Sequence, residues 1–224
     1  MAKIQWDMHR WETCYELENL GEYLRLMEEQ FSKVKEAAKN TLPNRPSGLS
    51  EEEYSDWQSE INFYEERFEK FFPSKLRYSF ITLLQIVFEV KLKSACDEIA
   101  RRKKFNIKEK DFRGASIERA EIFITKVLKI NPPKQNTFLK DLQKIRDCIV
   151  HCNGNINLSR DKTHLNNLTI NQSGISKGES GSIVIEREYC EFIFEKCFEY
   201  FYDLFESTDF GPVAVITMGP EDRI

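Results

Sequence analysis

One stretch of the chain, LQKIRDCIVHCNGN at residues 142–155, holds two side chains whose types suit one reaction. It contains Arg146 and one of only three histidines, His151. An imidazole moves protons near neutral pH, and a guanidinium fork matches phosphate oxygens and stabilises charge that develops on them. The 2′-hydroxyl of RNA is an internal nucleophile. The pair therefore suits metal-independent cleavage of an RNA phosphodiester.

The spacing of this motif decides which side chains share a helix face. A helix turns about 100° per residue, so Arg146 and His151 lie roughly 140° apart. Asp147 precedes His151 by four residues and shares its face, so we expect Asp147 to hold the imidazole by one nitrogen. Arg146 and His151 can meet on one phosphate if a second copy of the helix opposes the first. The alternative is an ordinary helix-end histidine, which gains from the helix dipole when protonated.

Apolar residues that recur every three or four positions predict an all-α protein, an antiparallel bundle of about six helices. The third helix is apolar nearly all round at residues 80–90, so we expect it at the centre of the core. Residues 155–186 are rich in Gly, Ser and β-branched residues and predict a short β-hairpin or irregular insertion before the last helix. The expected helices span about residues 5–39, 51–72, 74–103, 117–130, 138–152 and 187–205.

The expected helix starts follow from cap and breaker residues. Ser50 and Glu53 form a capping box for the second helix, and Pro73 marks the start of the third. Ser116 is the expected N-cap of the fourth helix. Either Asn136 or Thr137 is that of the fifth, which carries the motif.

Charge is unevenly distributed along a chain of net charge -4. Residues 73–151 carry 18 basic and 9 acidic residues, a balance of +9. This concentration favours a polyanionic partner, with RRKK at Arg101, Arg102, Lys103 and Lys104, together with Lys144, as candidate RNA contacts. The alternative is a set of ordinary solvated helix faces.

The cysteines and the apolar runs exclude several classes of protein. The six cysteines show no CxxC pair and no zinc spacing with histidine, so we expect reduced thiols, no metal site and no cofactor. A hydrolase that uses Cys152 beside His151 is a weak alternative, because adjacent helical residues point about 100° apart.

The charged start lacks a signal peptide, and the longest apolar run, FITLLQIVFEV, is too short for a membrane span. We expect a cytoplasmic protein.

The motif resembles that of the HEPN family, an Arg, four to six residues with a polar one first, and then His near a helix end. RDCIVH has four intervening residues with Asp147 in the polar position, and the final aromatic helix at residues 187–205 is similar to the family layout. The resemblance covers roughly residues 73–205. It does not explain residues 1–72 or the insertion at residues 155–186. We expect residues 1–72 to form a helical extension that packs on the bundle. The expected HEPN-like domain spans 73–209, and 210–224 form a tail.

The resemblance implies a dimer that brings two motifs together, and in active members metal-independent RNA cleavage in toxins or antiviral defence. It implies Arg146 and His151 as catalytic residues and Asp147 as their support. A second hypothesis is a non-catalytic helical dimer that binds a nucleotide or a partner protein in the same cleft. Trp6, Trp11 and Trp57 in the acidic first two helices could contact a regulatory protein or antitoxin, or could be ordinary core.

Overall fold

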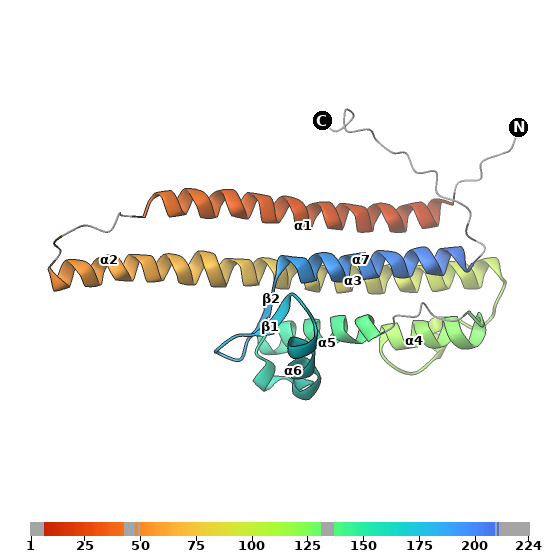
Figure 1. Ribbon diagram of the computed structural model, residues 1–224. Coiled ribbons are helices and arrows are strands. Elements are labelled where there is room, and N and C mark those ends of the chain that lie inside the picture. The colour runs from red at the N-terminus through yellow and green to blue at the C-terminus, as the bar shows by residue number, and fades with distance from the viewer. Residues whose placement is uncertain (1–6, 43–47, 49, 131–136, 209, 211–224) are drawn as a thin grey trace, which may run out of the picture. The chain divides into compact units, whose positions relative to one another are not determined.

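The computed structural model describes residues 7–42, 48, 50–130, 137–208 and 210, and these residues form an all-α fold with one small hairpin. The fold class predicted from the sequence is confirmed, including the hairpin just before the last helix (Figure 1). The elements are α1 (Met8–Asn40), α2 (Glu51–Tyr64), α3 (Phe72–Arg102), α4 (Ser116–Ile122), α5 (Thr137–Cys152), α6 (Lys162–Asn171), β1 (Ile175–Lys177), β2 (Ile183–Ile185) and α7 (Arg187–Glu206).

The chain divides into two compact units, and α1, α3 and α7 each contribute residues to both. The first unit comprises residues 1–19, 87–136 and 195–224. Aromatic rings fill its core, where Phe88 and Phe201 are buried with centroids 5.0 Å apart. The second unit comprises residues 20–86 and 137–194 and contains the whole Arg146–His151 motif. Its buried side chains include Phe80, Leu84, Leu142, Ile145, Leu165, Ile185 and Tyr189.

The helical segment from Glu51 to Arg102 is continuous, so the predicted new start at Pro73 is wrong. A π-helical segment at Glu65–Phe71 joins α2 to α3. Proline lacks an N–H and its ring crowds the carbonyl four residues earlier, which here is the carbonyl of Glu69 within the widened π-helical segment. The helix therefore runs through residues 72 and 73, where the sequence suggested a domain boundary.

Three of the predicted cap residues, Ser50, Ser116 and Thr137, lie in the described residues. Thr137 is the first residue of α5 rather than its N-cap. The Ser50–Glu53 capping box is confirmed, because the Ser50 N–H donates to Glu53 Oε2 at 2.9 Å and the Glu53 N–H donates to Ser50 Oγ at 3.3 Å. Ser116 is the first residue of α4 rather than its N-cap. Ala115 holds the cap position and its N–H donates to Glu118 Oε2. Asn136 lies outside the described residues, as do Trp6 and residues 211–224 of the predicted tail.

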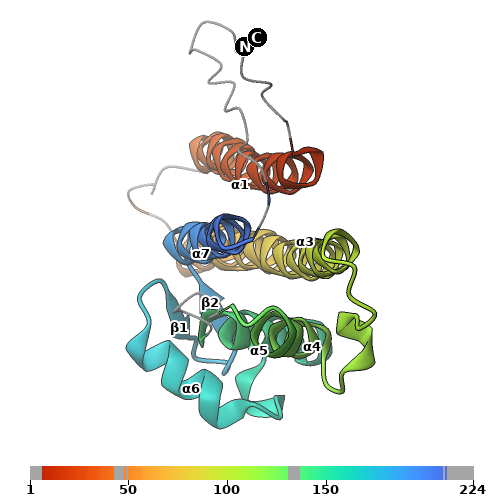
Figure 2. The ribbon, with the colours of Figure 1, turned by 90° about the vertical axis from the view of Figure 1, so that its right-hand side faces the viewer.

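The predicted insertion at residues 155–186 contains the hairpin and also a helix that the sequence pattern did not indicate. β1 and β2 pair antiparallel, with Ile175 opposite Ile185. α6 precedes them and contacts both α5 and β1, and these elements lie together in Figure 2. α6 was missed because it is short, rich in Asn and Thr, and buries only Leu165 fully.

The expectation of a centrally buried third helix holds on one face only. Phe80, Leu84 and Phe88 of α3 are fully buried. On another face Leu83 and Ile86 are 39% and 48% exposed in the single chain. In the described part of the chain, no helix is both long and apolar enough to cross a membrane.

Candidate functional site at the end of α5

An apolar stripe fixes the orientation of α5 in the second unit. Leu139, Leu142, Ile145 and Cys148 recur every three or four residues and are buried. The same packing leaves Arg146 and Asp147 partly exposed and His151 exposed. The prediction that the motif lies at the end of a helix is confirmed, and its side chains are on the solvent side of α5.

Arg146 and Asp147 are joined to each other. Arg146 Nη1 donates a 2.7 Å hydrogen bond to Asp147 Oδ1, and the two side chains are 28% and 30% exposed. The expected contact between Asp147 and His151 is absent. Within the residues that the structure describes, the His151 ring makes no hydrogen bond or ion pair. The aspartate holds the guanidinium, and the imidazole stays free to contact another molecule.

The helix stays regular through His151, so the two predicted catalytic side chains do not converge in one chain. α5 continues to Cys152, and five residues of regular helix separate Arg146 and His151 by roughly 140° around its axis. A single copy of α5 therefore presents the two side chains on different faces of the helix.

Two residues with positive φ end the motif helix. Asn153 has φ 50° and Gly154 has φ 80°, which is the left-handed region that glycine and asparagine adopt most readily. The Gly154 N–H donates to the Cys148 carbonyl at 3.0 Å, and the Gly154 carbonyl accepts from Ile183 of β2 at 2.8 Å. The turn after His151 is therefore fixed against the hairpin.

Tyr78 of α3 lies directly against this turn. A Cβ at Gly154 would lie 2.2 Å from the Tyr78 hydroxyl oxygen, so only glycine fits. The hydroxyl donates to the Ile183 carbonyl, and burial raises the pKa of Tyr78. One tyrosine thus connects α3, the end of α5 and β2.

Lys75, one turn before Tyr78, contacts the residue that follows the motif helix. Its Nζ donates to Asn153 Oδ1 at 2.8 Å. The same amine lies over the rings of Phe71 and Tyr78, 5.6 and 5.2 Å from their centroids. This lysine was not among the predicted site residues, because its partner lies 78 positions away in sequence.

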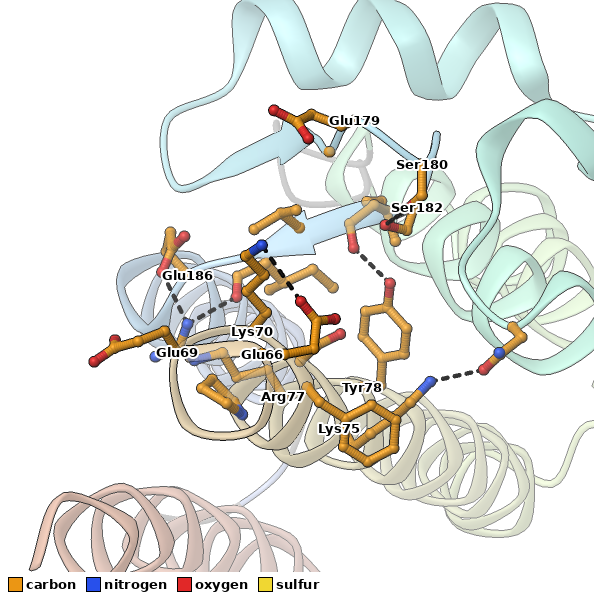
Figure 3. Close-up of a pocket in the computed structure, with 18 residues that line it drawn as sticks. Glu66, Glu69, Lys70, Lys75, Arg77, Tyr78, Glu179, Ser180, Ser182 and Glu186 are labelled. Carbon is orange, nitrogen blue, oxygen red and sulfur yellow. Dashed lines mark hydrogen bonds and ion pairs between the residues drawn. The ribbon is translucent and has the colours of Figure 1, made fainter. Parts of the chain in front are cut away.

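A hollow of about 710 Å³ lies between this helical segment and the hairpin, and we call it the hairpin pocket. In Figure 3, Glu179, Ser180 and Ser182 lie on the hairpin side, whereas Lys70, Lys75 and Tyr78 lie on the helical side. Its lining comprises Glu66, Glu69, Lys70, Phe71, Pro73, Ser74, Lys75, Arg77, Tyr78, Asn153, Gly178, Glu179, Ser180, Ser182, Ile183, Val184, Ile185 and Glu186.

Most charges of the hairpin pocket are already paired. Lys70 is 3.4 Å from Glu66, and Arg77 forms 2.8 Å ion pairs with Glu28 and with Glu186. Glu69 pairs with Lys35. Among the described lining residues, Lys75 is the one base without a carboxylate partner, and Glu179 is the one acid without a basic partner.

The predicted basic RNA contacts are partly engaged within the chain. Arg101, Arg102, Lys103 and Lys104 belong to the first unit. Arg102 bonds to both Asp7 and Glu98, whereas Arg101 is 72% exposed and bonds to Glu98. Hydrogen bonds from Arg101 and Arg102 lower the pKa of the Glu98 carboxyl to about 2. Lys104 is exposed, and Lys144 of the second unit forms a 2.8 Å ion pair with Asp161.

A second Asp–His pair was missed by the sequence analysis. His164 Nε2 lies 2.6 Å from Asp141 Oδ1, joining α6 to α5. Its two members are 23 residues apart and one lies in the unpredicted helix, so no local spacing could have indicated it. It provides a natural comparison for His151.

The cysteines are free thiols, as predicted. Cys96, Cys148, Cys190 and Cys197 are buried, and burial raises the pKa of the Cys148 thiol to about 11. Over the described residues, no group of three His, Cys, Asp or Glu side chains is placed to hold a metal ion.

Comparisons with known proteins give no further assignment. No family model matches the chain, no curated protein matches it, and no solved structure matches it.

Proposed function

We propose that the protein is a metal-independent endoribonuclease of the HEPN type, acting as a toxin or an antiviral-defence effector. One observation carries the proposal. The exposed His151 ring has no partner among the described residues, and it follows by five positions an accessible Arg146 whose guanidinium is held by Asp147.

The proposed reaction assigns one task to each side chain. A neutral His151 takes the proton of an RNA 2′-hydroxyl, and the oxygen attacks the adjacent phosphorus. Arg146 stabilises the negative charge that develops on the phosphate oxygens. The bond to the 5′-oxygen breaks, and a protonated imidazole supplies the proton of that leaving group. The products are a 2′,3′-cyclic phosphate and a free 5′-hydroxyl.

The proposed site requires two copies of the chain, because Arg146 and His151 diverge on one helix. Exposed apolar side chains near the motif support a homodimer. Leu83 and Ile86 of α3 line an open groove together with Ile149 of α5, and the neighbouring Val150 is 52% exposed. Pairing two such surfaces would remove apolar area from water and bring two motif helices together.

The second candidate function is a non-catalytic helical dimer that binds a nucleotide or a partner protein. The hairpin pocket favours it, since its volume of about 710 Å³ lies within the range of small-molecule sites. Under either function, an antitoxin or other regulatory protein is a proposed partner. The free thiols suit a reducing compartment, and we place the protein in the cytoplasm.

The test compares wild type, His151→Ala and His164→Ala on total cellular RNA in the presence of EDTA. His164 is the control, because it is the other histidine of the same unit and lies outside the motif. His151→Ala should lower the cleavage rate by roughly 10²- to 10⁴-fold, as loss of a general acid or base does. His164→Ala should retain cleavage, and the products should carry 2′,3′-cyclic phosphates.

The contrary outcomes separate the alternatives. Equal cleavage by wild type and His151→Ala would place the activity elsewhere, and loss in His164→Ala alone would assign it to the Asp141–His164 pair. Absence of cleavage by the folded wild type on several RNA classes would favour the non-catalytic dimer. Circular dichroism of each variant checks that the helices are intact.

A further inference from the structure

The hairpin pocket holds one positive charge that no carboxylate of the described residues neutralises. Lys75 Nζ donates to the neutral Asn153 amide oxygen and lies over two aromatic rings. An ammonium has three donors, so two remain for a ligand. Neither the amide nor the rings remove its charge, and the group is therefore suited to an anionic oxygen such as that of a phosphate.

A flat apolar surface lies beside this charge. The Phe71 side chain is 51% exposed, and its ring centroid is 5.6 Å from Lys75 Nζ. Exposed aromatic rings beside a basic group are the usual platform for bases of single-stranded nucleic acid. Across the hollow, the Ser180 and Ser182 hydroxyls lie 2.9 Å apart on the hairpin turn (Figure 3).

Most acidic residues of the pocket already have a basic partner. Glu66 pairs with Lys70 and Glu69 with Lys35, whereas Arg77 is shared between Glu186 and Glu28. Glu179 is unbalanced but lies on the turn, on the hairpin side. There its carboxylate can accept a hydrogen bond from the amino group of a base.

We propose that the hairpin pocket is a subsite for one nucleotide of the RNA substrate, adjacent to the phosphodiester that is cleaved. Lys75 binds its phosphate and Phe71 stacks on its base. The inference rests on the proposed function, and its link to that site is Asn153, which follows His151 by two residues and bonds directly to Lys75.

The experiment measures binding of a short single-stranded 2′-O-methyl oligonucleotide by fluorescence anisotropy across a range of salt concentrations. This probe keeps the phosphates and bases but lacks the nucleophilic hydroxyl, so the measurement does not depend on cleavage. The variants are Lys75→Gln, which retains an N–H donor for Asn153 without the charge, Lys75→Arg, which restores the charge, and Phe71→Leu. Lys70→Gln is the matched control, because Lys70 lines the same pocket and is paired with Glu66.

Loss of one phosphate contact should flatten the slope of log affinity against log salt by about 0.7 in Lys75→Gln. Lys75→Arg should restore the slope, and Lys70→Gln should leave it unchanged. Phe71→Leu should weaken binding by roughly 5- to 150-fold, which is the range for loss of one base-stacking contact. Thermal unfolding of each variant shows that the fold is retained, and a merely structural role of Lys75 would not change the salt slope.

Equal salt slopes for wild type, Lys75→Gln and Lys70→Gln would overturn the subsite. If RNA is cleaved while Lys75→Gln and Phe71→Leu bind the probe normally, the subsite fails and the proposed ribonuclease stands. If the predicted binding losses occur but wild type cleaves no RNA, the pocket still binds a nucleotide and the catalytic proposal fails.

Discussion

Asp147 Oδ1 accepts a 2.7 Å hydrogen bond from Arg146 Nη1. These adjacent residues of the motif are therefore paired with each other, and His151 bonds to neither of them. The two side chains have similar exposure, and the contact between them is a charge-assisted hydrogen bond. In the structure Asp147 therefore holds the guanidinium, whereas the sequence spacing alone favoured an interaction with the imidazole.

Asp147→Ala should lower kcat/KM by less than about tenfold, since a partly exposed ion pair contributes up to about 1 kcal/mol. Asp147→Asn should have a smaller effect, because it retains an acceptor oxygen. A double-mutant cycle in kcat/KM identifies the partner. Asp147→Ala should add little to Arg146→Ala but should keep its full effect in His151→Ala. The opposite pattern, in which Asp147→Ala adds little to His151→Ala but keeps its full effect in Arg146→Ala, would show that Asp147 acts on the imidazole.

The homodimer should depend on the exposed apolar side chains of α3. Leu83→Glu and Ile86→Glu place charges in the proposed interface, so each should shift sedimentation toward the monomer and lower cleavage together with it. Ile170→Glu is the control, because Ile170 on α6 is 79% exposed and lies outside the groove. A wild-type protein that sediments as a monomer at micromolar concentration would contradict the composite site.

The residues of the RRKK segment should differ in their roles, some contributing to RNA binding and others to stability. Arg101→Ala with Lys104→Ala should weaken RNA binding and flatten its salt dependence, because both side chains are exposed. Arg102→Ala should instead lower the free energy of unfolding by about 1–3 kcal/mol, since the Asp7 carboxylate, only 5% exposed, would lose its ion pair with Arg102. Urea unfolding and anisotropy distinguish the two effects. Unchanged salt dependence in the double variant would identify the segment as solvated surface.

The sequence predicted correctly those features that depend on residues close together in the chain. The Ser50–Glu53 capping box depends on residues three positions apart and is confirmed. The apolar spacing of α5 likewise follows from neighbouring positions, and its Leu139, Leu142 and Ile145 are buried. Pro73 gave the wrong prediction because a proline defect can be absorbed by a π turn, and sequence spacing does not distinguish that outcome from a break.

The parts of the site that escaped prediction come from distant segments. Lys75 and Asn153 are 78 residues apart, and Tyr78 and Ile183 are 105 apart. Such contacts arise only when α3, α5 and the hairpin pack together, so no spacing rule indicates them. The Arg146–Asp147 pair is local, but whether Asp147 bonds to Arg146 or to His151 depends on side-chain conformation rather than on position along the helix.

The turn that ends the motif helix should tolerate no side chain at Gly154. Gly154→Ala introduces a residue at φ 80°, which costs about 1–2 kcal/mol, and places a Cβ 2.2 Å from the Tyr78 hydroxyl oxygen. Relief of that clash requires Tyr78 to leave the Ile183 carbonyl, so the total loss in the free energy of unfolding should reach about 2–4 kcal/mol.

Gly48 provides the matched control for this substitution, because its φ is 83° and no atom of the described residues lies within 4 Å of an added Cβ. Gly48→Ala should show the cost of backbone strain alone. The difference between the two variants in urea unfolding measures the contact with Tyr78. Because that contact fixes the chain just after His151, Gly154→Ala should also lower kcat under conditions where the protein remains folded, whereas Gly48→Ala should not. Equal stability losses in the two variants would show that Tyr78 does not constrain the end of α5.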